Sequence, residues 1–175
     1  MINLHWRPNS DLSEESATAL GAQLQEILER WEGTPYVEGM QGEGQGVDCV
    51  RFVYAALDEL HGFERRDPTT LPQDSAMHNA KGAFRVMRGM CERYPHVRVL
   101  DGSLEPSDVV VMGPSDGGPG HAMIVGPKRW QIWHSTELHV HYTGRSYLLS
   151  KGRKVFRVYR MTSKEKWPWA APQID

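Results

Sequence analysis

Hydrophobic residues in the first half of the chain recur at the three-and-four spacing of amphipathic helices, with polar residues between them. One such pattern covers residues 11 to 31, where Asp11 and Glu14 have the spacing of a capping box. Its apolar positions are Ala17, Leu20, Leu24, Ile27, Leu28 and Trp31. A second pattern covers residues 49 to 61, and a third covers residues 74 to 93. The chain is therefore predicted to begin with helices.

Beyond residue 96 the pattern changes to short segments that are rich in β-branched and aromatic residues and separated by turn residues. These segments cover residues 97–100, 108–112, 121–126, 130–134, 138–142 and 155–160. Helices followed by a run of strands are typical of an α+β fold with an antiparallel sheet. We expect one domain over residues 1–175, with a helical N-terminal part over residues 1–30 and a surface tail over residues 161–175.

The charge balance excludes several classes of partner. The 20 basic and 22 acidic residues give a net charge of -2 and form no basic stripe, so we expect no nucleic acid partner. No apolar run is long enough to span a bilayer, so we expect no membrane insertion. The polar N-terminus lacks the pattern of a secretory signal, which predicts cytoplasmic synthesis without export by the general secretory route. Two cysteines do not form a disulfide framework.

The segment GQGVDCVRF, residues 44–52, places Cys49 at the predicted start of the second helix, directly after Asp48. The free N–H groups and partial positive charge of a helix start stabilise a thiolate. The same N–H groups would face an oxyanion that forms beside the sulfur. Taken alone, Cys49 is more simply explained as a small buried hydrophobic residue. Its interpretation therefore depends on the histidines of the chain.

Two histidines have the positions that a cysteine nucleophile requires. His121 opens a predicted strand after the segment PSDGGPG, and His134 ends the next strand. An imidazole must take the thiol proton and return it to the leaving amine, and a third polar group must orient that imidazole. A turn around residues 126–129 would bring the two strands together as an antiparallel pair, with His121 near His134. The alternative for His134 is a half-buried strand histidine that hydrogen-bonds to the backbone.

Three segments of the chain read GTPYVEGMQGEGQGVDCVRFVYAALDELHG, LEPSDVVVMGPSDGGPGHAMIVG and WQIWHST. In this order, across residues 31 to 136, they resemble the three conserved blocks of NlpC/P60 cysteine peptidases. The resemblance implies a papain-like fold. It also implies that Cys49 is the nucleophile, His121 the base and His134 the orienting residue.

The resemblance assigns substrate contacts as well. The hydroxyl of Tyr36 would line the site, and Asp48 would meet a free amine of the substrate. The chain departs from the family where Val50 and Arg51 replace Ser-Gly after the nucleophile, and this leaves the specificity open. Arg51 either binds a substrate carboxylate as a bidentate fork or pairs with Asp48 or Glu43.

Two further pairs of residues carry weaker signals. We expect Trp130 and Trp133 to share one strand face, where they either wall the cleft near His134 or pack in the core, and we include Trp133 among the candidate substrate contacts. His139 and His141 share a strand face at a spacing of two. Because neither clustered carboxylates nor paired cysteines accompany them, we predict no metal site and no cofactor.

The resemblance implies a cysteine peptidase or amidase that hydrolyses small peptides through a thioester acyl-enzyme. Its expected substrate is a peptide of bacterial peptidoglycan, often cut between D-glutamate and a diamino acid. A wall hydrolase without an export signal needs another route, and we expect delivery in a phage tail, with tail proteins as further partners. A secretion system, or wall recycling inside the cell, would also provide a route. A binding or assembly module with weak hydrolysis, and a transferase that uses the same triad, stay open.

Overall fold

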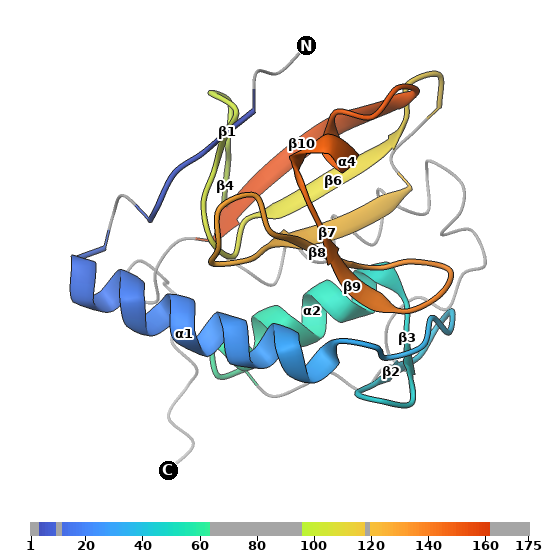
Figure 1. Cartoon of the computed structure of the whole chain (residues 1–175), viewed down its shortest axis with the longest axis horizontal. Coiled ribbons are helices and arrows are strands. Elements are labelled where there is room, and N and C mark those ends of the chain that lie inside the picture. Colours follow the sequence, from blue (N-terminus) through green and yellow to red (C-terminus); the bar gives the residue numbers. More distant parts are fainter. Residues whose placement is uncertain (1–3, 10–11, 64–95, 118–119, 162–175) are drawn as a thin grey trace.

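A six-stranded antiparallel sheet forms the centre of the fold, and the two long helices of the described residues cover one of its faces (Figure 1). The computed structural model describes residues 4–9, 12–63, 96–117 and 120–161. In sheet order the strands are β4 (His96–Arg98), β10 (Arg153–Met161), β6 (Val109–Pro114), β7 (His121–Val125), β8 (Ile132–Ser135) and β9 (Val140–Thr143). Every pair within this sheet is antiparallel, so the α+β class predicted from the sequence is confirmed.

Helix α1 (Glu14–Trp31) buries the face that its periodicity predicts, with Leu24, Ile27 and Leu28 fully or nearly fully inside. Its start differs from the prediction. Ser13 is the N-cap, and its hydroxyl oxygen accepts the N–H of Ser16 at 3.2 Å, so the helix begins at Glu14 rather than near residue 11. Serine and aspartate are about equally good N-cap residues, so the sequence did not distinguish Ser13 from Asp11 as the cap.

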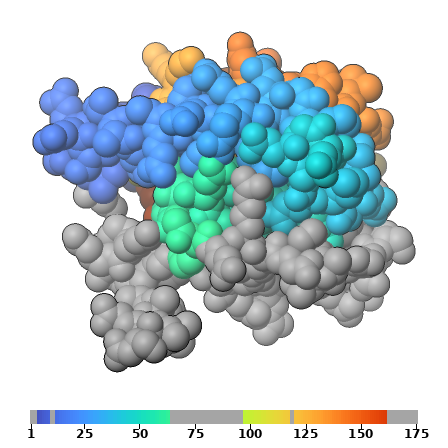
Figure 2. Space-filling model, turned by 90° about the horizontal axis from the view of Figure 1, so that it is seen from below, coloured from blue at the N-terminus to red at the C-terminus, as the bar shows by residue number. Residues whose placement is uncertain are grey.

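Helix α2 (Cys49–Leu60) begins at the residue that the sequence predicts, with Asp48 as its N-cap. All of its residues except Glu59 are buried. Since α1 packs on one side of α2 while β7 and β8 pack on the other, this helix has almost no solvent face. Viewed from the helix side, α1 and the segment with β2 (Gln41–Gly42) and β3 (Gly46–Val47) form much of the surface (Figure 2).

The strands largely follow the predicted segments, with shifted ends. The elements that the hydrophobic pattern did not predict are short: β1 (His5–Trp6), β2, β3, β5 (Ser103–Leu104) and α4 (Arg145–Leu148). Two-residue strands are too short to show a period, so only tertiary contacts define them. The predicted helix over residues 74–93 lies outside the described residues, as does nearly all of the predicted tail.

The two faces of the sheet bury separate hydrophobic clusters. The helix side holds Trp133 with α1 and α2, whereas the opposite side holds Met123 and Ile132 with Trp130 packed against them. The expectation that Trp130 and Trp133 share a face is therefore wrong. Residues three apart on a strand point to opposite faces, and Trp130 also has a φ of 61°, outside strand geometry.

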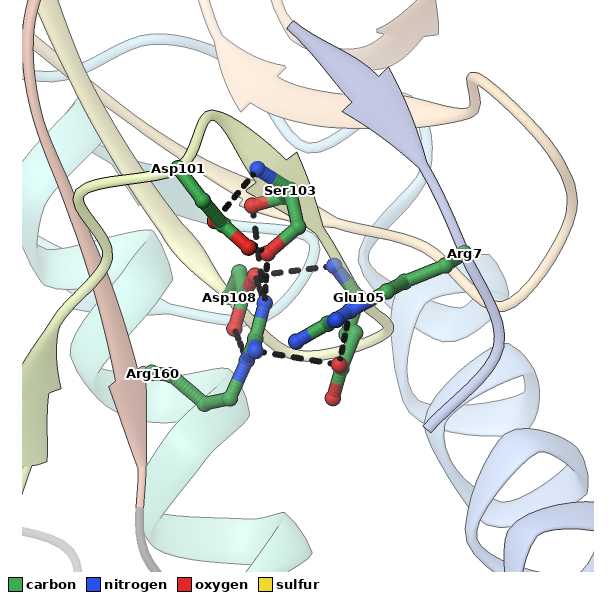
Figure 3. Close-up of polar contacts among 6 residues, drawn as sticks. All are labelled: Arg7, Asp101, Ser103, Glu105, Asp108 and Arg160. Carbon is green, nitrogen blue, oxygen red and sulfur yellow. Dashed lines mark hydrogen bonds and ion pairs between the residues drawn. The ribbon is translucent and has the colours of Figure 1, made fainter. Parts of the chain in front are cut away.

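A buried ionic network ties the N-terminal segment to the sheet (Figure 3). Arg160 on β10 donates to both carboxylate oxygens of Asp108, from Nε at 3.0 Å and from Nη2 at 2.8 Å. Its Nη1 lies 3.0 Å from Oε1 of Glu105, which also accepts Nε of Arg7 at 2.6 Å. Arg7 directly follows β1, which pairs in parallel with β5. The network therefore joins β1, the β5–β6 turn and β10, on a part of the molecule that shares no residue with the site described next.

No helix among the described residues is long and apolar enough to cross a membrane.

Candidate active site

Asp48 fixes the start of the helix that carries Cys49. Its Oδ1 accepts the N–H groups of Val50 at 3.0 Å and Arg51 at 2.8 Å, and its Oδ2 accepts the N–H of Gly39 at 3.0 Å. Nη1 of Arg51 donates to the same Oδ2 at 2.5 Å. These bonds hold the loop before the helix and the first helical turn together. They place Cys49 as the first residue of α2, as the sequence predicts.

His121 and His134 form the bonded pair that the strand pattern predicts. Nε2 of His121 lies 2.8 Å from Nδ1 of His134, and the ring centroids are 5.0 Å apart. Strands β7 and β8 bring them together because they pair antiparallel across a short turn. The bond uses Nε2 of His121, so Nδ1 is the ring nitrogen left to exchange a proton with a thiol.

Cys49 and His121 open into one cavity of about 580 Å³. The backbone N–H of Ala122, the residue after His121, hydrogen-bonds toward the Cys49 sulfur. The nucleophile candidate and the imidazole pair therefore meet where α2 begins and β7 begins. The cavity is lined by Tyr36, Cys49, Val50, Val111, Gly120, His121, Ala122, Ser135, Thr136, Glu137, Leu138, His141, Tyr147 and Arg153.

Burial controls the protonation of this site. It raises the pKa of the Cys49 thiol to about 12, while the N–H groups of Ala122, Cys49 and Val50 lower it and the charge of Asp48 raises it. Burial also lowers the pKa of His121 to about 4 and that of His134 to about 3. The helix start acts in the predicted direction, but burial outweighs it. The resting pair is thus a neutral thiol beside a neutral imidazole, rather than the thiolate expected from the sequence.

This protonation state predicts how Cys49 reacts with an alkylating agent. Because only the thiolate reacts, we expect the rate of iodoacetamide labelling to rise about tenfold per pH unit between roughly pH 6 and 9. The rate is measured by mass spectrometry on the peptide that contains Cys49, in a Cys91→Ser background so that a single thiol is followed. A rate independent of pH over this range would contradict the neutral pair and indicate a thiolate–imidazolium pair.

The lowered pKa values of His121 and His134 predict that acid destabilises the fold. The histidines take up protons near pH 6.5 in the unfolded chain but only near pH 4 and pH 3 in the folded one. Their contribution to stability is complete above about pH 6.5. It is lost as the pH falls from there through the folded pKa values of about 4 and 3. We expect the free energy of unfolding in urea to fall by about 1 kcal/mol or more per pH unit in this window.

The matched control for this acid sensitivity is the His121→Gln/His134→Gln double variant, which removes both titrating groups. Its free energy of unfolding should change less steeply with pH, whatever its absolute value. An unchanged slope would mean that the acid sensitivity arises elsewhere in the protein.

The predicted substrate contacts fall into two groups. Tyr36 lines the cavity, and burial raises the pKa of its phenol, so the hydroxyl keeps its proton. Asp48 and Arg51 do not line the cavity, because they are 0% and 2% exposed and form an ion pair with each other. This pairing is one of the two interpretations of Arg51, and it leaves neither side chain a surface that a ligand can reach. We therefore do not include either residue in the proposed substrate contacts.

Trp133 does not line the cavity that contains Cys49 and His121 either. It is 1% exposed and belongs to the core cluster on the helix side of the sheet, where its ring lies 5.3 Å from that of Tyr142. Of the two interpretations that the sequence left open for Trp133, the structure shows packing in the core.

Three cavity residues were not found from the sequence. His141 on β9 lies directly across from His134, with ring centroids 4.6 Å apart. Tyr147 of α4 packs edge-on against the His134 ring, with centroids 4.8 Å apart, and Arg153 donates from Nη1 to the Tyr147 hydroxyl at 2.6 Å. Only the register of β9 against β8 could have indicated His141, since α4 and the start of β10 carry no motif.

Nε2 of His134 is buried and has no hydrogen-bond partner among the described residues. The rings of His141 and Tyr147 pack against the His134 ring, with centroids 4.6 and 4.8 Å away. His134 is thus held by ring contacts with His141 and Tyr147 and by one hydrogen bond to His121. This arrangement fixes the ring that orients the predicted base.

Within the described ranges, no three His, Cys, Asp or Glu side chains lie together in a way that could hold a metal ion. The rings of His139 and His141 do lie close, with centroids 5.2 Å apart. However, Nδ1 of His141 bonds to the backbone oxygen of His139 at 3.1 Å. The geometry around these two histidines is that of a local hydrogen bond.

A papain-like α+β domain with a cysteine at a helix start and two bonded histidines is the class that this fold and site define. The NlpC/p60 domain of the peptidoglycan hydrolase SagA superposes with a TM-score of 0.50 at 21% sequence identity, covering 81% of this chain and 98% of that domain. A Staphylococcus aureus protein described as similar to a lipoprotein of the NLP/P60 family superposes with a TM-score of 0.52 at 13% identity, covering 87% of this chain and 43% of that one.

No family model and no curated protein matches the sequence. The two superpositions show that the chain has the fold of NlpC/P60 domains.

Proposed function

We propose that the protein is a cysteine peptidase of the NlpC/P60 type that hydrolyses short peptides of bacterial peptidoglycan. The observation that carries this proposal is the 2.8 Å bond between Nε2 of His121 and Nδ1 of His134, in the cavity that also contains Cys49. A base oriented by a third group beside a nucleophile is the arrangement that covalent acyl transfer requires.

In the proposed reaction the Cys49 sulfur attacks the scissile carbonyl carbon while its proton moves to Nδ1 of His121. The imidazolium then gives that proton to the leaving amine, and the C–N bond breaks to leave a thioester. A water molecule, deprotonated by His121, attacks the thioester, and Cys49 recovers its proton as the acid product leaves. His134 keeps the His121 ring in place and stabilises its charged form.

The oxyanion needs donors that point into the cavity, and the structure narrows the choice. Asp48 occupies the N–H groups of Val50 and Arg51, so among the first three N–H groups of α2 only that of Cys49 is not bound to it. Tyr36 lines the same cavity with a hydroxyl that stays protonated. We therefore assign the oxyanion to the Cys49 N–H and the Tyr36 hydroxyl.

The proposal is tested by incubating purified peptidoglycan fragments with the wild-type protein and with Cys49→Ala, followed by mass spectrometry of the products. We expect a mass change that corresponds to addition of one water at a peptide bond, present with the wild type and absent with the variant. Absence of a cysteine-dependent product across several wall chemistries would overturn the proposal.

A binding module with little hydrolysis is the second candidate, and the neutral protonation state of Cys49 and His121 favours it. The same fragments distinguish it from the peptidase. A binding module would retain them with equal affinity in the wild type and in Cys49→Ala, without any cleavage.

A further inference from the structure

Among the described residues, two charged side chains other than histidine line the cavity, and these are Glu137 and Arg153. The negative charge of Glu137 helps to raise the pKa of Tyr36. The positive charge of Arg153 helps to lower the pKa values of His121 and His134. The contacts agree for Arg153, because it bonds to Tyr147 and the Tyr147 ring packs against His134, so its positive charge lies near the imidazole pair.

The guanidinium of Arg153 is held in a defined position although the residue is exposed. Nη1 donates to the Tyr147 hydroxyl at 2.6 Å, and the guanidinium carbon lies 4.4 Å from the centroid of the same ring. The Tyr147 ring in turn packs against His134. Arg153 is thus fixed relative to the imidazole pair, which reduces the ordering that a ligand would have to impose.

A fixed positive charge at this place opposes catalysis unless something neutralises it. The proposed reaction forms an imidazolium at His121, and a nearby cation makes that charge less favourable. The other charged groups that line the cavity do not pair with Arg153 among the described contacts. An anion brought by the substrate would remove the penalty at the moment when the imidazolium is needed.

The position of Arg153 also indicates which part of the substrate carries the anion. His121 must reach the leaving amine to protonate it, so the residue that leaves lies on the His121 side of the scissile bond. Arg153 lines the cavity and lies near His121, because it bonds to Tyr147, which packs against the bonded partner of His121, His134. A guanidinium presents a planar fork of donors that matches a carboxylate.

We propose that Arg153 binds a carboxylate on the residue whose amine is released, so that the protein selects peptides with a free carboxyl group next to the scissile bond. This inference rests on the proposed peptidase function. One interpretation of the sequence assigned a carboxylate contact to Arg51, and this inference assigns such a contact to Arg153 instead.

The test uses two peptides with a γ-D-glutamyl bond to a diamino acid, one with a free carboxyl group on the diamino acid and one with a carboxamide in its place. For the wild type we expect kcat/KM to be about 10- to 100-fold higher for the carboxylate, the effect of one charge-assisted hydrogen bond. In Arg153→Met this preference should fall to within about threefold, and Arg153→Lys should restore part of it.

Two further variants separate recognition from support of the fold. If Arg153 only anchors Tyr147, Arg153→Met and Tyr147→Phe would slow both peptides equally and leave the preference unchanged, which would overturn the proposal. Arg157→Met, on the same strand but outside the cavity lining, should leave both rates unchanged. Circular dichroism of each variant confirms that it is folded.

Binding to Cys49→Ala protein, measured by calorimetry with the same two peptides, keeps the two proposals distinguishable. Tighter binding of the carboxylate, lost in the Cys49→Ala/Arg153→Met double variant, supports the contact even if no peptide is cleaved. Cleavage of both peptides with equal kcat/KM and equal affinity would leave the peptidase proposal intact and refute the role of Arg153.

Discussion

Replacing His121 with alanine is expected to lower kcat for peptide hydrolysis by about 10³- to 10⁴-fold, because the variant lacks the group that we propose takes the Cys49 proton and returns it to the leaving amine. His134→Ala should lose about 10- to 100-fold, since it removes only the partner that orients His121 across the 2.8 Å bond. Single-turnover assays with a peptidoglycan peptide, which report the acylation step directly, measure both effects.

The control for the histidine variants is His139→Ala. His139 is exposed on the chain beside His141 and does not line the cavity, so its removal should change kcat less than about threefold. The KM values matter as well, because a proton-transfer role affects kcat with little change in substrate binding. A His121→Ala variant that retained wild-type kcat would exclude the proposed base and favour the binding module.

Replacing Arg160 with methionine is expected to lower the free energy of unfolding by about 3–5 kcal/mol. The change leaves the carboxylates of Asp108 and Glu105 buried, at 0% and 3% exposure, without the guanidinium that joins them (Figure 3). Uncompensated buried charges are among the largest single causes of destabilisation. Equilibrium urea unfolding followed by tryptophan fluorescence measures the loss.

Two further variants test the cause of this destabilisation. Arg157→Met, three positions earlier on β10, should change the free energy of unfolding by no more than about 0.5 kcal/mol. The double variant Arg160→Met/Asp108→Leu removes one of the stranded charges and should recover part of the loss. If Asp108→Leu lowers the free energy of unfolding by the same amount in the Arg160→Met background as in the wild type, loss of the ion pair is not the cause of the destabilisation.

The local features of the site could be predicted from the sequence. Asp48 before an apolar helical pattern is an N-cap, and N-capping depends on bonds between residues two and three positions apart, so the start of α2 at Cys49 follows from local chemistry. The pairing of His121 with His134 also follows, because two strands joined by a short turn have few ways to pair. The cap of α1 could not be chosen, since Asp11 and Ser13 both suit that role.

The fate of the residues next to Cys49 could not be predicted in the same way. Arg51 has the same sequence neighbours whether it faces solvent or the core. Its burial against Asp48 depends on α1 and the sheet closing over both sides of α2. The protonation state of Cys49 differs from the predicted thiolate for the same reason. Desolvation depends on every element that surrounds the sulfur, and its effect on the pKa outweighs that of the helix start.

The sequence by itself therefore determined the α+β class, the helix that carries Cys49 and the two histidines that face each other, since periodicity, capping and short turns act over a few residues. Only the tertiary structure decided that Tyr147 and Arg153 line the cavity that contains Cys49, that Asp48 and Arg51 do not line it, and that Trp133 belongs to the core. The physical reason is that each of these outcomes depends on contacts between residues far apart in the chain, and such contacts leave no period or spacing in the sequence.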